Sequence, residues 1–121
     1  MKDPRISHVV TKLAQSLGDS WSVEKMAAFL GMSTSNFQRV FRDELKTSPM
    51  AYFHSLRLEK ASEMLADPEC FQQIKAIAYS VGLNDNSHFT RDFKKRFGAT
   101  PTEYRRHHAN IHQSASPDGH E

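Results

Sequence analysis

Two segments of this 121-residue chain carry arginine and short polar side chains at the same spacing. Arginine and glutamine donate paired hydrogen bonds to the edges of bases, and hydroxyl side chains permit close approach to a groove. Such residues along one face of a helix indicate recognition of double-stranded DNA through its major groove. The equivalent pairs are Ser35 and Ser87, Gln38 and Thr90, Arg39 and Arg91, and Arg42 and Lys94.

Both segments predict helices, because their phenylalanines recur at helical spacing. Phe37, Phe41 and Leu45 share one face of a helix with about 3.6 residues per turn, and Phe89 and Phe93 repeat the pattern. The polar pairs fall on the opposite face, and neither polar stripe contains an acidic residue. A plain solvated face is the alternative, but such faces usually mix both signs of charge. The stripes therefore favour binding to DNA.

The formal net charge of +2 conceals an uneven distribution. Residues 89–108 hold six basic and two acidic side chains, whereas residues 59–85 hold two basic and five acidic ones. Cations beside the polar stripes suit the DNA backbone. His88, at the edge of its stripe, is expected to pack or to contact phosphate. The expected phosphate contacts are Thr34, Arg42, Lys46, Lys94, Lys95 and Arg105.

Start and stop signals predict helices over the rest of the chain. Pro4 opens an apolar periodicity that ends at Gly18, and Ser22 and Ser33 are placed to cap the next two helices. Ser48, followed by proline, starts a fourth helix that runs to about residue 66. No alternating stretch long enough for a strand occurs. The chain is therefore expected to be all-α.

The helical unit occurs twice. Residues 23–32 align with 74–83, and the Phe37–Phe41 segment aligns with Phe89–Phe93. Each copy places alanine four residues before glycine, the spacing of a helix-turn-helix. We expect a bipartite domain over residues 1–108, with a first subdomain at about 6–47, a linker helix at about 49–65 and a second subdomain at about 72–108. Residues 109–121 lack periodicity and are expected to form a disordered tail.

The stretch from Asn86 to Arg105 resembles the signature of the AraC/XylS family of bacterial transcription regulators. The first copy, Gly31–Phe41 followed by Ser48–Pro49, is similar to the first module of that family. The resemblance covers about residues 6–107. It implies seven helices in two helix-turn-helix subdomains joined by a long helix. The base contacts that it implies fall on Ser35, Gln38, Arg39, Asn86, Ser87, Thr90 and Arg91.

The resemblance also bears on the length of the chain. Members of the family usually carry a separate effector or dimerisation domain, for which this chain has no room. The abrupt start at Asp3–Ile6 leads us to expect a fragment of a longer regulator.

Other chemistry finds little support in the sequence. The single cysteine, Cys70, has no basic neighbour that would activate its thiolate and suits a reducing cytoplasm. His107, His108 and His112 lack the spacing of a structural zinc site. No signal peptide, membrane span, catalytic motif or cofactor motif is recognisable, so we expect no enzyme, no metal and no cofactor.

These patterns predict a cytoplasmic, sequence-specific DNA-binding domain that regulates transcription. The long helix is roughly 25 Å long at about 1.5 Å per residue. With its flanking turns it could hold two recognition helices near one DNA turn, about 34 Å apart. The alternative is a helical adaptor that contacts RNA polymerase or another regulator through the acidic face at Glu59–Glu69. RNA polymerase is also an expected partner of a DNA-bound regulator.

Overall fold

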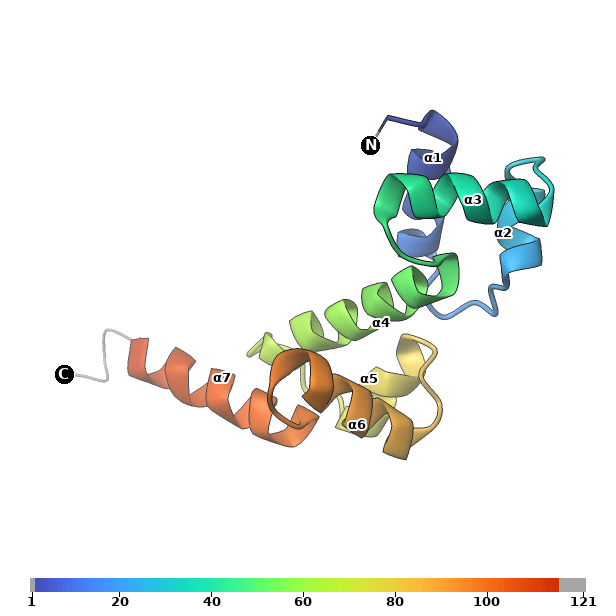
Figure 1. The fold of residues 1–121 in the computed structure, drawn as a ribbon. Coiled ribbons are helices and arrows are strands. Elements are labelled where there is room, and N and C mark those ends of the chain that lie inside the picture. The colour runs from blue at the N-terminus through green and yellow to red at the C-terminus, as the bar shows by residue number, and fades with distance from the viewer. Residues whose placement is uncertain (1, 116–121) are drawn as a thin grey trace. The chain divides into compact units, whose positions relative to one another are not determined.

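The computed structural model of the chain describes residues 2–115 (Figure 1). Within these residues the backbone forms seven helices and no strand, which confirms the all-α class. The helices are α1 Pro4–Gln15, α2 Val23–Phe29, α3 Thr34–Leu45, α4 Pro49–Ala66, α5 Ile74–Ser80, α6 Asn86–Phe97 and α7 Pro101–Ala115.

Side-chain caps fix where α2 and α3 begin. The hydroxyl of Ser22 accepts a hydrogen bond from the backbone nitrogen of Lys25 at 3.1 Å. The hydroxyl of Ser33 accepts one from the backbone nitrogen of Asn36 at 3.2 Å. The first N–H groups of a helix lack partners inside it, so each bond stabilises the helix start. Both predicted caps are confirmed.

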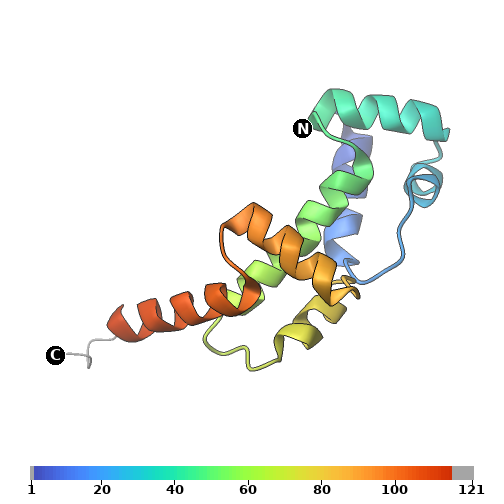
Figure 2. The same cartoon turned by 60° about the horizontal axis from the view of Figure 1, so that its bottom comes forward.

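Glycines in equivalent turns make the sharp changes of direction after α2 and α5. Gly31 and Gly82 have φ of 68° and 84°, a left-handed conformation that glycine adopts without steric cost. In Figure 2, α2 is seen end-on while α3 lies across the view, so the first turn sets these helices at a steep angle. A backbone hydrogen bond closes each turn. The N–H of Met32 donates to the carbonyl of Ala27 at 2.9 Å, and the N–H of Leu83 donates to the carbonyl of Ala78 at 2.8 Å.

Residues 1–57 form one compact unit, called unit 1 below. Its core packs one face of α1 against α2, α3 and the first half of α4. Burial of such side chains stabilises the fold by about 1.5–3 kcal/mol each. The core residues are Ile6, Val9, Leu13, Met26, Ala27, Phe37, Phe41 and Phe53.

Residues 58–115, the described part of the remaining chain, form the second compact unit, unit 2. Its core repeats the plan of unit 1, with α5 and α6 packed on the second half of α4. Tyr104 of α7 lies edge to face with Phe93, with ring centroids 5.2 Å apart, and so joins α7 to this core. The buried residues are Leu58, Ala61, Leu65, Ile77, Ala78, Val81, Phe89 and Phe93.

Helix α4 therefore contributes to both cores. Phe53 is 1% exposed in the core of unit 1, and Leu58 is 4% exposed in the core of unit 2. As predicted, this helix joins the two units, and it also supplies apolar side chains to each of them. Arg57 precedes the boundary and donates to the carbonyls of Leu17 and Asp19, both at 2.8 Å, which ties α4 to the loop after α1.

Helix α7 begins as predicted and extends further than predicted. Thr100 and Glu103 form a reciprocal capping box: the nitrogen of Thr100 donates to Glu103 at 2.9 Å and the nitrogen of Glu103 to Thr100 at 3.2 Å. The helix continues to Ala115, so residues 109–115, expected in the tail, are helical. They contain neither glycine nor proline, and loss of apolar periodicity removes packing but not helix propensity. Residues 116–121 lie outside the described residues.

Candidate nucleic-acid interface

Helix α3 has a buried face and an exposed face. Phe37 and Phe41 are 0% exposed, and their ring centroids lie 5.6 Å apart. These two rings fix the rotation of α3 about its axis, so the opposite face points to solvent. Ser35, Gln38, Arg39, Arg42 and Lys46 are all exposed on that face.

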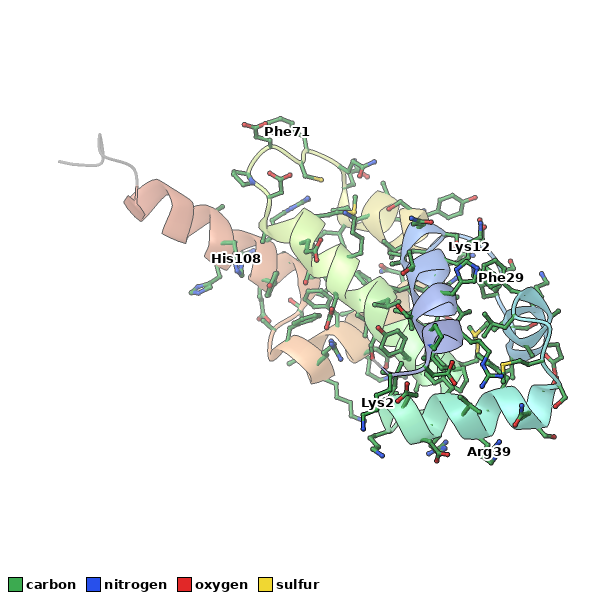
Figure 3. All side chains as sticks on the ribbon, turned by 90° about the horizontal axis from the view of Figure 1, so that it is seen from above. Lys2, Lys12, Phe29, Arg39, Phe71 and His108 are labelled. Atoms are coloured by element: carbon green, nitrogen blue, oxygen red, sulfur yellow. The ribbon has the colours of Figure 1, made fainter. Side chains whose placement is uncertain are left out.

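Arg39 lies on the outer side of α3 and points away from α1 (Figure 3). Its side chain is 66% exposed. A guanidinium presented in this way offers paired N–H donors to the O6 and N7 acceptors of guanine. The structure thus brings Arg39 together with Ser35 and Gln38, as the sequence predicted. Whether these residues contact bases remains a prediction.

Helix α6 repeats this arrangement in unit 2. Phe89 and Phe93 are 1% and 0% exposed, with ring centroids 5.7 Å apart. The polar residues lie on the other side, with Thr90 half-buried and the others exposed. The exposed positions are Asn86, Ser87, Arg91 and Lys94.

Asp85 caps the N-terminus of α6. Its carboxylate accepts a hydrogen bond from the backbone nitrogen of His88 at 3.1 Å, and His88 Nδ1 lies 3.1 Å from its other oxygen. The backbone hydrogen bond from His88 is the largest cause that lowers the pKa of Asp85. This negative charge interacts favourably with the positive end of the helix dipole. Asp85 and His88 were not paired in the sequence analysis, although their i, i+3 spacing at a helix start was a usable signal.

Most of the expected phosphate contacts flank the two polar faces. Arg42, Lys94 and Lys95 are exposed, and Thr34 is half-buried at the start of α3. Lys46 is exposed, and its Nζ donates to the carbonyl of Asp43 at 2.9 Å. These positions are compatible with backbone contacts on each side of a groove, which remain predictions.

Arg105 does not share this surface, because its guanidinium binds the loop between α4 and α5. Nη1 donates to the carbonyl of Gln72 at 2.6 Å, and Nη2 lies 3.4 Å from the carbonyl of Cys70. Arg105 is half-buried, and these contacts span more than 30 residues of sequence. Sequence periodicity gave no sign of this loop contact. We therefore give Arg105 no part in the interface proposed below.

Sequence reasoning also missed a contact of Arg39 within α3. Arg39 Nη2 donates to Asn36 Oδ1 at 2.5 Å, and Arg39 Nη1 lies 3.8 Å from Asp43 Oδ2. The i, i+3 and i, i+4 spacings place all three side chains on neighbouring positions of one helix surface. Asn36 thus joins the residues that determine the geometry of the polar face.

The acidic region of residues 59–69 is partly neutralised. Glu59 forms an ion pair with Arg96, and Lys60 Nζ lies 3.8 Å from Glu63. The adaptor alternative assigned partner binding to the acidic face of these residues. These pairs weaken that alternative.

Cys70 and the histidines are the remaining residues whose side chains could carry thiol or metal chemistry. No group of three or more His, Cys, Asp or Glu side chains there could hold a metal ion. Cys70 is half-buried, and the expectation that it has no basic neighbour is wrong, because its sulfur lies 4.0 Å from Arg105 Nη2. The side chain of His112 is outside the described set. Among residues 2–115, no helix has the length and apolar character needed to cross a membrane.

A family model described as "Helix-turn-helix domain" matches residues 26–107. The "RCS-specific HTH-type transcriptional activator RclR" of Escherichia coli strain K12 is 36% identical over 102 residues. That alignment covers 84% of this chain and 35% of that protein. The chain spans about a third of the length of the curated relatives it matches.

Solved structures agree with this match. A transcriptional regulator from Chromobacterium violaceum, described as AraC-type DNA-binding domain-containing, has a TM-score of 0.78 at 26% identity. The comparison covers 94% of this chain and 95% of that one. The DNA-binding domain of AdpA, crystallised with a target DNA, has a TM-score of 0.78 at 22% identity, covering 93% and 96%. At that identity it supports the fold alone.

Proposed function

The chain belongs to the AraC-type helix-turn-helix family and forms the DNA-binding domain of a transcription regulator, and we propose that α3 and α6 both read bases in the major groove. The observation that carries this proposal is the pair of exposed faces with arginine and short polar side chains, which lie opposite the buried phenylalanines of α3 and α6. A helix presented in this way fits the major groove, where each base pair displays a distinct pattern of donors and acceptors.

Roles can be assigned from exposure and chemistry. The two arginines, Arg39 and Arg91, supply the strongest base-specific donors, because a guanidinium binds guanine through two hydrogen bonds. The shorter polar side chains allow the helix to approach the bases. The base-contacting set is Ser35, Gln38, Arg39, Asn86, Ser87, Thr90 and Arg91, and the phosphate-contacting set is Thr34, Arg42, Lys46, Lys94 and Lys95.

Partners beyond DNA follow from the relatives. Several relatives are named transcriptional activators, so we include RNA polymerase as a protein partner of the DNA-bound chain. The alignments cover only 35% and 34% of two of these relatives, which supports an effector or dimerisation domain elsewhere in such regulators. Regulation of transcription would place the protein in the bacterial cytoplasm, with the nucleoid.

Selection from random duplex DNA tests the two-helix proposal directly. The selected site should be protected from hydroxyl radicals in two segments, one for each recognition helix. Arg39→Ala or Arg91→Ala should weaken binding by about 1–3 kcal/mol and relax the preference at one base pair each. Equal losses on selected and random DNA would reduce either arginine to a phosphate contact. A single protected segment would exclude the proposal that both helices read bases.

A further inference from the structure

The exposed polar faces of α3 and α6, called reading faces below, differ in the contacts that hold their central arginine. In α3, Asn36 Oδ1 accepts a hydrogen bond from Arg39 Nη2 at 2.5 Å. Asp43 Oδ2 lies 3.8 Å from Nη1, the other terminal nitrogen of the Arg39 guanidinium. Arg39 is thus bracketed by the residues three positions before it and four positions after it.

The equivalent positions of α6 do not repeat this bracket. His88 replaces Asn36 there, and its Nδ1 lies 3.1 Å from Asp85 at the helix start. Lys95, a cation, stands at the position of Asp43. Arg91 Nε instead lies 3.8 Å from the adjacent Asp92. The duplicated units therefore hold equivalent arginines by different means.

We propose that Asn36 is a positioning residue that fixes the guanidinium of Arg39 for base recognition and makes α3 the more discriminating of the two readers. The inference rests on the proposed contact of Arg39 with a base. Nη2 carries two N–H groups, so the bond to Asn36 leaves the other N–H groups of Arg39 available to DNA.

Two observations favour Asn36 over Asp43 as the principal partner. Asn36 is half-buried, and its side-chain Oδ1 lies within hydrogen-bond distance of Arg39 Nη2, at 2.5 Å. The side chains of Asp43 and Arg39 are 71% and 66% exposed, and an exposed ion pair at 3.8 Å contributes little.

Holding an arginine in the free protein affects binding through entropy. A long side chain loses rotamer freedom when it is immobilised at an interface, and prior ordering reduces that loss. It also favours one orientation of the guanidinium, which sharpens the distinction between a correct and an incorrect base. Removing Asn36 should therefore reduce both affinity and base preference, and both effects should depend on Arg39.

A double-mutant cycle on the whole chain tests this dependence. The variants are Asn36→Ala, Arg39→Ala and the double variant, and binding to the selected duplex and its single-base-pair variants is measured by fluorescence anisotropy. We expect Asn36→Ala to weaken binding to the selected duplex by about 3- to 10-fold. Its largest loss of discrimination should fall on the base pair that Arg39→Ala relaxes. In the Arg39→Ala background, the same change should have no further effect.

The outcomes separate this inference from the proposal on which it rests. An unchanged base preference in Asn36→Ala overturns the positioning role, as does an equal loss in the Arg39→Ala background, which would indicate a direct contact from Asn36. If Arg39→Ala itself changes no base preference, the proposed base contact fails, and the positioning role fails with it.

Two further variants control for structure and charge. Asn36→Asp keeps an acceptor for Arg39 and adds a negative charge, so it should retain the base preference while weakening binding to every duplex alike. His88→Ala is the matched change in α6 and should leave the preference at the Arg91 base pair unchanged. Loss of preference in Asn36→Asp, or an equal loss in His88→Ala, would count against an orienting bond that is particular to α3.

Discussion

Lys46 and Gly98 hold the same left-handed backbone conformation at the C-caps of α3 and α6, with φ of 61° and 80°. Each donates its backbone N–H, at 2.8 Å, to the carbonyl four residues earlier, from Arg42 and Lys94 respectively. Glycine adopts this conformation without steric cost, whereas a residue with a Cβ atom is disfavoured by about 1 kcal/mol. Unit 1 therefore retains a strained lysine where unit 2 has glycine.

We predict that Lys46→Gly stabilises the chain and weakens its binding to DNA. The free energy of unfolding should rise by about 0.5–1 kcal/mol, because the strain at φ 61° is relieved. Binding should weaken on random and selected duplexes alike, because a phosphate contact carries no sequence information. Urea denaturation and anisotropy measure the two effects. Gly98→Ala is the converse control and should lower stability. A less stable Lys46→Gly variant would contradict the strain argument.

Arg105→Ala should destabilise unit 2 without changing the salt dependence of DNA binding. The guanidinium donates to the carbonyl of Gln72 at 2.6 Å, and because water can replace this exposed bond, its loss should cost about 0.5–1.5 kcal/mol. Chemical denaturation measures the loss, and Arg106→Ala, at an exposed neighbour, is the control. A shallower salt slope in Arg105→Ala would restore the phosphate role that the sequence suggested.

Lys94→Ala and Arg39→Ala should have different signatures in a salt titration. Helix α6 carries four basic residues and one acidic residue, whereas α3 carries two of each. Loss of a phosphate contact lowers the slope of log affinity against log salt by about 1, and we expect this for Lys94→Ala. Arg39→Ala should retain nearly the full slope and lose preference at one base pair. The reverse pattern would exchange the two assigned roles.

Asp85→Asn should flatten the acid limb of the stability profile. The cap from the backbone nitrogen of His88 lowers the pKa of Asp85 in the folded chain. Its contribution is therefore complete above the pKa of the unfolded chain, about 3.9, and is lost as the pH falls through the lower folded value. Asparagine also caps helices but does not titrate in this range. The melting temperature should fall less steeply between about pH 5 and pH 2 in the variant than in the unchanged chain. Parallel profiles would exclude a contribution from Asp85.

Local chemistry explains which parts of the fold were predictable. Ser22 and Ser33 are followed by helical periodicity, so the starts of α2 and α3 could be identified from the sequence. The start of α5 was harder to place, because Gln73 makes no side-chain capping bond. The end of α7 was misplaced, because a helix can continue beyond its last apolar contact.

The candidate site also has parts that could be predicted from the sequence and parts that could not. Periodicity predicted the exposure of Arg39 and Arg91, because Phe37 and Phe89 fix the opposite faces of their helices. The function of Arg105 could not be predicted, because its carbonyl partners lie more than 30 residues away in sequence. Contacts that depend on a loop conformation leave no periodic trace.

The separation of core and reading face has a consequence for evolution. Burial in α3 and α6 depends on Phe37, Phe41, Phe89 and Phe93, whereas the proposed base contacts come mainly from exposed positions. Exchanges at exposed positions usually alter stability by less than about 0.5 kcal/mol. A lineage could therefore acquire specificity for a new operator through successive single substitutions, because each variant along the way would still fold. The two copies could diverge in what they read while keeping the same fold.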